Sequence, residues 1–138
     1  MNQLEPSRSP ENWPSPDSLD ALVAAPAYHT RLFENERVRV LHTHIPAGAL
    51  VPLHTHRYSG VAFLLSHSHF IRRDHQGTVL LDSRQASASP DVSVVQWLEP
   101  LPPHTVENVG ESEISLFIVE IKNGVFRATA AMTGFPTT

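Results

Sequence analysis

The chain has 138 residues, 41% of them hydrophobic and 17% charged, with a formal net charge of −4 and no cysteine. This length suits one domain, and the lack of cysteine excludes disulfides, thiolate metal ligands and a cysteine nucleophile. No basic run is present, which argues against a nucleic-acid partner. No apolar run could cross a bilayer and residues 1–16 do not resemble a secretory signal, so we expect a soluble, cytoplasmic protein without a membrane partner.

The N-terminal segment, residues 1–20, predicts a flexible arm because four prolines alternate with polar residues there. Trp13 is its one large aromatic residue, and we expect it to dock either on the body of the protein or on a partner subunit. Residues 17–25, which precede Pro26, predict one or two turns of helix.

From Tyr28 onward, short segments rich in apolar and β-branched residues alternate with turns that contain Gly, Pro, Asp or Asn. We predict strands over residues 31–33, 37–45, 50–57, 61–65, 68–73, 78–82, 92–97, 106–108 and 114–121. The continuous apolar run 61–65 is expected to be buried on both faces. Helical periodicity is almost absent, so the fold class is all-β, a sandwich or barrel over residues 21–122. The tail, residues 123–138, contains Phe126 and Phe135 and is expected to pack on the barrel or on a partner.

Six of the nine histidines form His-x-His pairs: His42 and His44, His54 and His56, and His67 and His69. On a strand, residues i and i+2 point to the same face, so a pair of imidazoles can grip one transition-metal ion. If Val38 and Val40 face the core, His42 and His44 do so too and line the cavity. The alternative places this pair on the outer sheet, at a dimer face.

Two half-motifs connect the histidines to a known family. Gly48, followed after five residues by His54-Thr55-His56, resembles the first half of cupin motif one. His104, followed after three residues by Asn108, resembles the end of cupin motif two. Together with the segments 33–41, 104–110 and 117–122, these residues are similar to a group of small single-domain bacterial cupins. The resemblance implies a jelly-roll β-barrel, a double-stranded β-helix, whose metal is bound by His54, His56 and His104.

The sequence departs from the cupin motifs at three positions. Gly60 stands where motif one usually has a glutamate, and Leu101 and Glu99 replace the usual glycine and proline of motif two. A site of three neutral histidines holds a divalent ion at higher net charge, so the ion is bound less tightly but is a stronger Lewis acid. In ligand number the site is similar to thiol and diketone dioxygenases, three-His cupins that use ferrous iron.

These observations favour a metal-binding cupin that acts on a small molecule, either as a three-His Fe(II)-type dioxygenase or as a Lewis-acid enzyme. The alternative is a non-catalytic module that binds a small ligand or a metal. The cofactor is expected to be a divalent transition metal, namely Fe, Mn, Ni or Zn. Tyr58 and His44 are the candidate catalytic residues, in the role of orienting the substrate. We expect a homodimer, because cupin barrels expose an apolar outer sheet.

The remaining polar and aromatic side chains lead to less specific expectations. His67 and His69 are expected on a solvated hairpin or rim, His29 and His75 in loops, and Trp97 in the core. Two alternatives are open for Arg72 and Arg73. Either one of them points inward and binds a carboxylate substrate, or both lie on a solvated face. Glu120 and Lys122 are expected to form a surface ion pair, Glu107 to be exposed, and Asn108 to bond the backbone of a turn.

Overall fold

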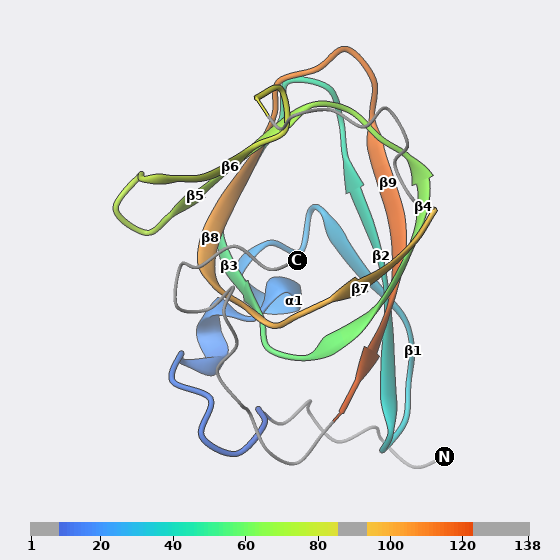
Figure 1. Ribbon diagram of the computed structural model, residues 1–138. Coiled ribbons are helices and arrows are strands. Elements are labelled where there is room, and N and C mark those ends of the chain that lie inside the picture. Colours follow the sequence, from blue (N-terminus) through green and yellow to red (C-terminus); the bar gives the residue numbers. More distant parts are fainter. Residues whose placement is uncertain (1–8, 86–93, 123–138) are drawn as a thin grey trace.

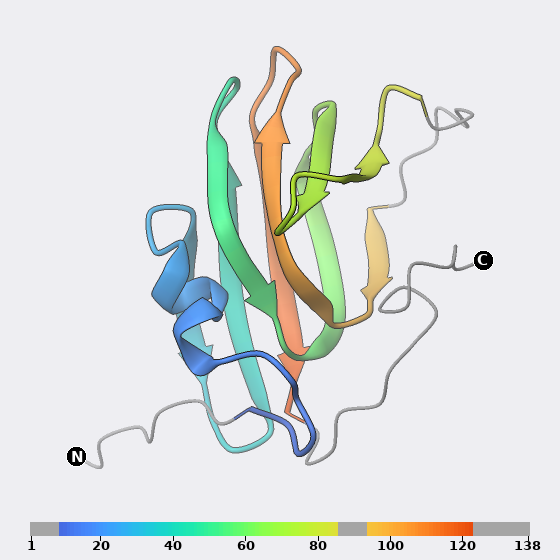
Figure 2. The same ribbon diagram turned by 90° about the vertical axis from the view of Figure 1, so that its left-hand side faces the viewer.

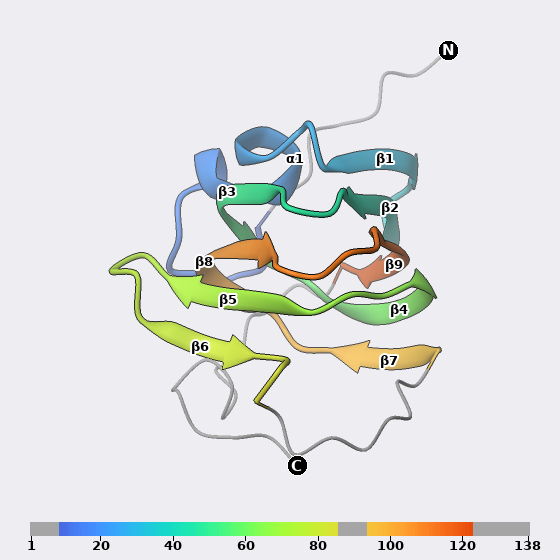
Figure 3. The same ribbon diagram turned by 90° about the horizontal axis from the view of Figure 1, so that it is seen from above.

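The computed structural model describes residues 9–85 and 94–122, which form two antiparallel sheets that face each other (Figure 1). The five-stranded sheet has the order β1 (His29–Glu34), β2 (Val38–Ile45), β9 (Ile114–Ile121), β4 (Ser59–Ser66) and β7 (Val95–Leu98). The four-stranded sheet has the order β3 (Leu50–His56), β8 (Leu101–Asn108), β5 (Phe70–Asp74) and β6 (Val79–Asp82). Seen from above, the two sheets lie on opposite sides of the molecule (Figure 3).

After β2 the chain passes repeatedly from one sheet to the other, and this connectivity makes the jelly-roll barrel. The predicted all-β fold is therefore confirmed, and each of the nine predicted strands has a counterpart in the structure. The largest difference in bounds is at β8, which begins at Leu101 rather than at Val106. Pro102 and Pro103 are tolerated there because the β3–β8 ladder is irregular between His54 and His56, so fewer backbone donors are needed.

The residues of β2 that face the core are not Val38 and Val40 but the residues that alternate with them. Arg39, Leu41, Thr43 and Ile45 are buried inside the barrel, whereas the alternate residues are only half-buried. Of the two alternatives for His42 and His44, the structure therefore agrees with the outer face of the sheet, and neither residue lines the cavity. The charged Arg39 can lie inside because Asp20 and Glu120 neutralise it.

The outer face of the five-stranded sheet is apolar and exposed. Phe63 and Leu65 on β4 are 40% and 57% exposed, and Trp97 on β7 is 55% exposed. The expectations that run 61–65 is buried on both faces and that Trp97 is a core residue are therefore wrong. In the part of the chain that the structure describes, no second layer of strands or helices covers this face.

The described part of the N-terminal segment docks on the barrel beside β3 (Figure 2). It contains a short 3-10 helix, η1 (Asp17–Leu19), and one turn of α-helix, α1 (Ala21–Ala24). Between them, Asp20 is buried and makes a bidentate pair with the Arg39 guanidinium, both N–O distances being 2.9 Å. Arg57, at the end of β3, contacts the carboxylates of Asp20 and Asp17 at 3.3 and 3.2 Å.

Trp13 is half-buried within this segment. Residues 1–8 of the predicted arm and the tail 123–138 lie outside the described residues, so the flexible arm and the docking of the tail stay predictions. Among the described residues, no helix has the length and hydropathy needed to span a membrane.

Candidate metal centre

The β3–β8 pairing brings the predicted histidines together. His54 lies directly opposite His104 in the antiparallel ladder, so both side chains point to the same face. Their ring centroids are 4.4 Å apart, and the ring of His56 is 4.9 Å from that of His54 and 5.6 Å from that of His104. His54 and His104 are each 1% exposed. Residues 50 positions apart in the sequence therefore converge inside the barrel.

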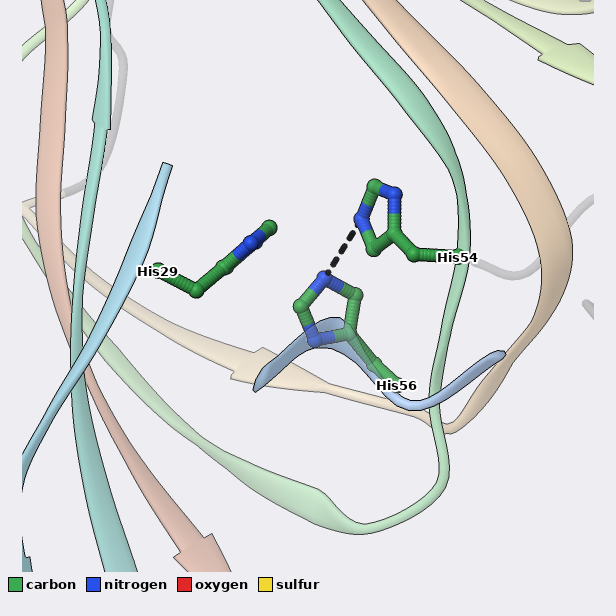
Figure 4. A group of neighbouring side chains, drawn as sticks. All are labelled: His29, His54 and His56. Atoms are coloured by element: carbon green, nitrogen blue, oxygen red, sulfur yellow. Dashed lines mark hydrogen bonds between the residues drawn. The ribbon is translucent and has the colours of Figure 1, made fainter. Parts of the chain in front are cut away.

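A fourth histidine, His29, joins this group from the five-stranded sheet (Figure 4). Its ring lies 4.9 Å from that of His54 and 5.3 Å from that of His56. One nitrogen from each of His29, His54 and His56 can be chosen so that the three lie within 4.8 Å of one another. The expectation that His29 is a loop residue is wrong, because it is the first residue of β1 and is 3% exposed.

Backbone carbonyls fix the protonation of three of these rings. Nδ1 of His29 bonds the carbonyl of Ala25 at 3.0 Å, and Nδ1 of His54 and His104 bond the carbonyls of Pro52 and Pro102, both at 2.7 Å. A carbonyl oxygen only accepts, so each Nδ1 carries the proton and donates it. In a neutral imidazole the other nitrogen, Nε2, then keeps its lone pair. Each of the three rings is thus set to bind a cation through Nε2.

Burial keeps these imidazoles neutral. It lowers the pKa of His54 to about 2 and that of His29 to about 3, and it lowers the pKa of His104 well below its ordinary value. Neighbouring histidines lower the pKa values further, because protonated rings would repel one another at these distances. A metal ion needs the unprotonated form, so it would not have to compete with protons at neutral pH.

The fourth ring, that of His56, lies beside the buried carboxylate of Glu120. Nε2 of His56 lies 3.2 Å from Nε2 of His54, and because His54 keeps a lone pair there, His56 has to donate. Nδ1 of His56 lies 3.9 Å from Oε2 of Glu120, and neither atom has a hydrogen-bond partner among the described residues. A cation on Nε2 would move the proton to Nδ1, where it can bond Glu120. The residues present therefore fit a metal.

Glu120 brings a carboxylate close to the histidines although the usual glutamate of motif one is absent. Gly60 on β4 lies directly opposite Glu120 on β9. A Cβ atom at position 60 would collide with the carbonyl oxygen of Val119, so this close approach of β4 and β9 requires glycine. The expected surface ion pair between Glu120 and Lys122 is wrong, because Glu120 is 1% exposed and bonds Arg39 at 2.6 Å, whereas Lys122 pairs with Glu34.

The four histidines open onto a cavity of about 180 Å³ between the two sheets. Its walls are mainly apolar and include Leu98, Leu101, Val106, Ile114, Leu116 and Ile118. Tyr58 also lines the cavity and is 3% exposed, and burial raises the pKa of its phenol, which therefore stays protonated. Its ring packs between the guanidinium groups of Arg39 and Arg57, at 5.1 and 5.4 Å. Thr43 adds a hydroxyl whose oxygen has no hydrogen-bond partner among the described residues.

The other candidate residues lie away from the cavity. His44 does not line it, its side chain is 45% exposed, and it contacts Glu113 at 2.6 Å on the outside of the barrel, so the structure does not support His44 as a catalytic candidate. His67, His69 and His75 are exposed, as expected for the first two. Asn108 bonds the backbone at Ile45, Gly110 and Ser112, which confirms its role in the turn.

Arg72 and Arg73 point to opposite sides of β5. Arg72 lines the cavity, whereas Arg73 pairs with the half-exposed Glu107 at 2.9 Å. Of the two alternatives for these arginines, the structure agrees with the one in which a single arginine points inward, and that arginine is Arg72.

No family model and no curated protein sequence matches the chain. Among solved structures, the chain is similar to a cupin domain from Bordetella pertussis Tohama I, with 21% identity, a TM-score of 0.53, and coverage of 69% of this chain and 92% of that one. It is also similar to an RmlC-like cupin family protein with a double-stranded β-helix fold from Methanocaldococcus jannaschii, with 11% identity, a TM-score of 0.48, and coverage of 70% and 80%. The first similarity shows that the chain has the cupin fold.

Proposed function

We propose that this protein is a metal-dependent enzyme that converts a small molecule inside the cupin barrel. His54, His56 and His104 would hold a divalent transition metal, with His29 as a fourth ligand from the opposite sheet. The observation that carries the proposal is the convergence of four histidines, of which His29, His54 and His104 are buried and present a lone pair on Nε2. Imidazole suits Fe, Mn, Ni and Zn to different degrees, so the donor set leaves the choice among these ions open.

When bound, the ion would supply Lewis acidity or, if it is iron, redox chemistry with dioxygen. The chain's own groups would position the substrate. Tyr58 and Thr43 both line the cavity, and the unpartnered hydroxyl of Thr43 can bond a polar atom of a bound molecule. The apolar walls exclude water and strengthen this hydrogen bond. With an ion on Nε2 of His56, Glu120 would accept a hydrogen bond from Nδ1 and orient the ring.

Elemental analysis of the purified protein tests the metal site. The protein is prepared metal-free, incubated with Fe(II), Mn(II), Ni(II) or Zn(II), and freed of excess ion. We expect about one ion per chain for at least one of these metals, with a large loss in His54→Ala, His104→Ala and His29→Ala. His75→Ala is the matched control, because His75 is exposed on the β5–β6 turn. Unchanged metal content in all three variants would place the site elsewhere.

Turnover by the metal-loaded protein separates the enzyme from the non-catalytic module. The protein is incubated in air with a panel of small thiols, diketones and β-amino acids, and oxygen uptake and product formation are recorded by electrode and mass spectrometry. The enzyme predicts turnover that disappears in His54→Ala and persists in His75→Ala. Tight binding of a panel member without turnover, with every one of the four metals, would favour the module.

We also propose that the protein is a homodimer that buries the outer face of the five-stranded sheet. Phe63, Val95 and Trp97 lie in neighbouring positions there and are 40%, 52% and 55% exposed. Val40, Phe117 and Val119 continue the face across β2 and β9. A contiguous apolar patch of this extent is typical of an interface.

Light scattering at micromolar concentration tests the dimer. We expect twice the chain mass for the wild type and the chain mass for the double variant Phe63→Ser, Trp97→Ser. Leu80→Ser is the control, because Leu80 is 48% exposed on β6 of the other sheet. A monomeric wild type would refute the proposal.

A further inference from the structure

Arg72 lines the cavity and can interact electrostatically with a molecule bound there. It lies on β5 opposite Val106 of β8, two residues from His104 in the same strand, and its side chain lines the cavity together with His54 and His104. Its positive charge contributes to the lowered pKa of both histidines, as expected for a guanidinium that lines the same cavity.

Arg72 differs from the buried Arg39 and Arg57 in having no carboxylate partner among the residues that the structure describes. Arg39 is paired with Asp20 and Glu120, and Arg57 with Asp20 and Asp17. Nε of Arg72 is buried without a hydrogen-bond partner, and no described carboxylate lies within 4.0 Å of its nitrogens. Its one recorded contact is with the ring of Phe70, whose centroid is 5.7 Å from Cζ. Glu99, a carboxylate in the cavity lining, accepts instead from Trp97 at 3.2 Å.

An unpaired guanidinium in an apolar cavity is costly, and burial lowers its pKa. The histidines do not relieve this cost, because as neutral imidazoles they bring no negative charge. A cation held by them would add two positive charges near Arg72. An anion in the cavity would satisfy the guanidinium and offset the charge of the ion at the same time.

We propose that the substrate is a small organic carboxylate and that Arg72 binds its carboxylate group while the histidine centre faces the rest of the molecule. This inference rests on the proposed function and names its substrate class. The planar fork of a guanidinium matches a carboxylate, which it can bind through two parallel hydrogen bonds. The cavity of about 180 Å³ and its apolar walls suit a molecule with a short hydrocarbon body. The hydroxyl of Thr43, which has no hydrogen-bond partner among the described residues, can bond a further polar group on that body.

Calorimetric titration of the zinc-loaded protein tests the proposal, with butyrate, butyramide and methyl phosphate as probes. Butyrate and butyramide have nearly the same shape and differ in charge. We expect butyrate to bind at least tenfold more tightly than butyramide and than methyl phosphate. Equal binding of the acid and the amide, or tighter binding of methyl phosphate, would overturn the proposal.

Substitutions show whether Arg72 is the cause of this preference. Arg72→Gln should lose at least tenfold of the affinity for butyrate, Arg72→Lys should keep part of it, and Arg73→Gln should behave as wild type because Arg73 points outward to Glu107. Wild-type affinity in both Arg72 variants would overturn the proposal. If Arg72→Gln fails to fold, Arg72→Lys and the selectivity of the wild type still decide the question.

A titration without metal separates this inference from the metal site. Arg72 belongs to the chain, so the preference for butyrate over butyramide should persist in the metal-free protein, and the zinc content of Arg72→Gln should equal that of the wild type. A preference that disappears with zinc and is indifferent to Arg72→Gln would show that the ion alone binds the acid. A chain that binds no metal but keeps an Arg72-dependent preference would refute the proposed function and leave the carboxylate site standing.

Discussion

Two His-x-His pairs with the same spacing point to opposite sides of the barrel wall. His54 and His56 on β3 point into the cavity, where they meet His104 and His29. His42 and His44 on β2 point outward: His42 contacts the hydroxyl of Ser115 at 2.9 Å, and His44 contacts Glu113 at 2.6 Å. The spacing therefore predicts that two imidazoles share a face, but it does not predict which face that is.

The two pairs also differ in the relative orientation of their imidazole rings. On β2, which pairs with β9 in an unbroken register, the rings of His42 and His44 are nearly parallel, with 6.2 Å between centroids and 13° between planes. On β3, the register shifts between His54 and His56, and the two rings meet edge to face at 4.9 Å and 86°. An irregular ladder re-aims side chains. The irregular β3–β8 ladder gives the rings of His54 and His56 different orientations, so that both can approach one ion.

The largest effect expected from this comparison is on metal affinity. His54→Ala removes the ring that touches all three other histidines, and we expect the dissociation constant for Zn(II) to rise more than 100-fold. His42→Ala removes a ring of the outer pair and should leave the constant unchanged. Competition with a chromophoric chelator measures both values. Equal losses in the two variants would contradict the assignment of the site to the inner pair.

Each pair also has its own carboxylate, which allows a second comparison. Glu120 faces Nδ1 of His56 inside the barrel, whereas Glu113 faces His44 in solvent. In Glu120→Gln the buried ring loses an acceptor that carries full negative charge, so we expect the affinity for Zn(II) to fall by about 10- to 100-fold. Glu113→Gln is the matched control and should bind zinc as the wild type does. Because Glu120 also bonds Arg39, circular dichroism should first confirm that the variant is folded.

The strands of the fold follow from local sequence, because each has its own apolar or β-branched run and its own turn. The face that each strand presents does not follow locally. On β2, either alternate set of residues is apolar enough for a core, and the choice depends on Asp20 and Glu120, which lie far away in the sequence and make it possible to bury Arg39. The exposure of Trp97 does not follow from its strand either, because within one strand an exposed apolar face has the same sequence pattern as a core face.

Among the site residues, His54, His56 and His104 could be predicted to lie together because they stand in recognisable motifs. His29 could not, because it lies two residues before the predicted strand 31–33, and only the pairing of β1 with β2 places it at the cavity. The predicted strand is itself the useful signal, because extending it by two residues makes His29 the first residue of β1. The position of Glu120 beside the site could not be predicted either. A single acid in a strongly apolar strand is equally consistent with a solvent-exposed edge and with a buried ion pair.

The inner histidines should also make folding sensitive to pH. In the metal-free protein, the pKa values of His29 and His54 lie below the value of about 6.5 for an unfolded histidine. Below that pH the unfolded chain binds more protons than the folded one, so the free energy of unfolding decreases as the pH falls from about 6.5 toward 3. At about pH 5.5 the loss should be about 1 kcal/mol for each such histidine.

Urea denaturation at several pH values between about 7.5 and 5 measures this loss. His54→Gln should show a shallower decrease than the wild type, because one of the protonating groups is gone. His42→Ala should keep the full decrease, since His42 is only half-buried on the outer face. A free energy of unfolding that is constant down to about pH 5 would mean that the inner histidines are not held neutral by burial.

The smallest effect is expected at the outer pair itself. His44 and Glu113 are 45% and 57% exposed, and an ion pair in solvent contributes at most about 1 kcal/mol because water and salt screen it. We expect His44→Ala to change the free energy of unfolding by less than about 1 kcal/mol at low salt, and by less still at high salt. Equilibrium denaturation with and without added sodium chloride measures the difference. A larger, salt-independent loss would show that the outer pair is buried in the native assembly, as it would be if the dimer face extended over β2.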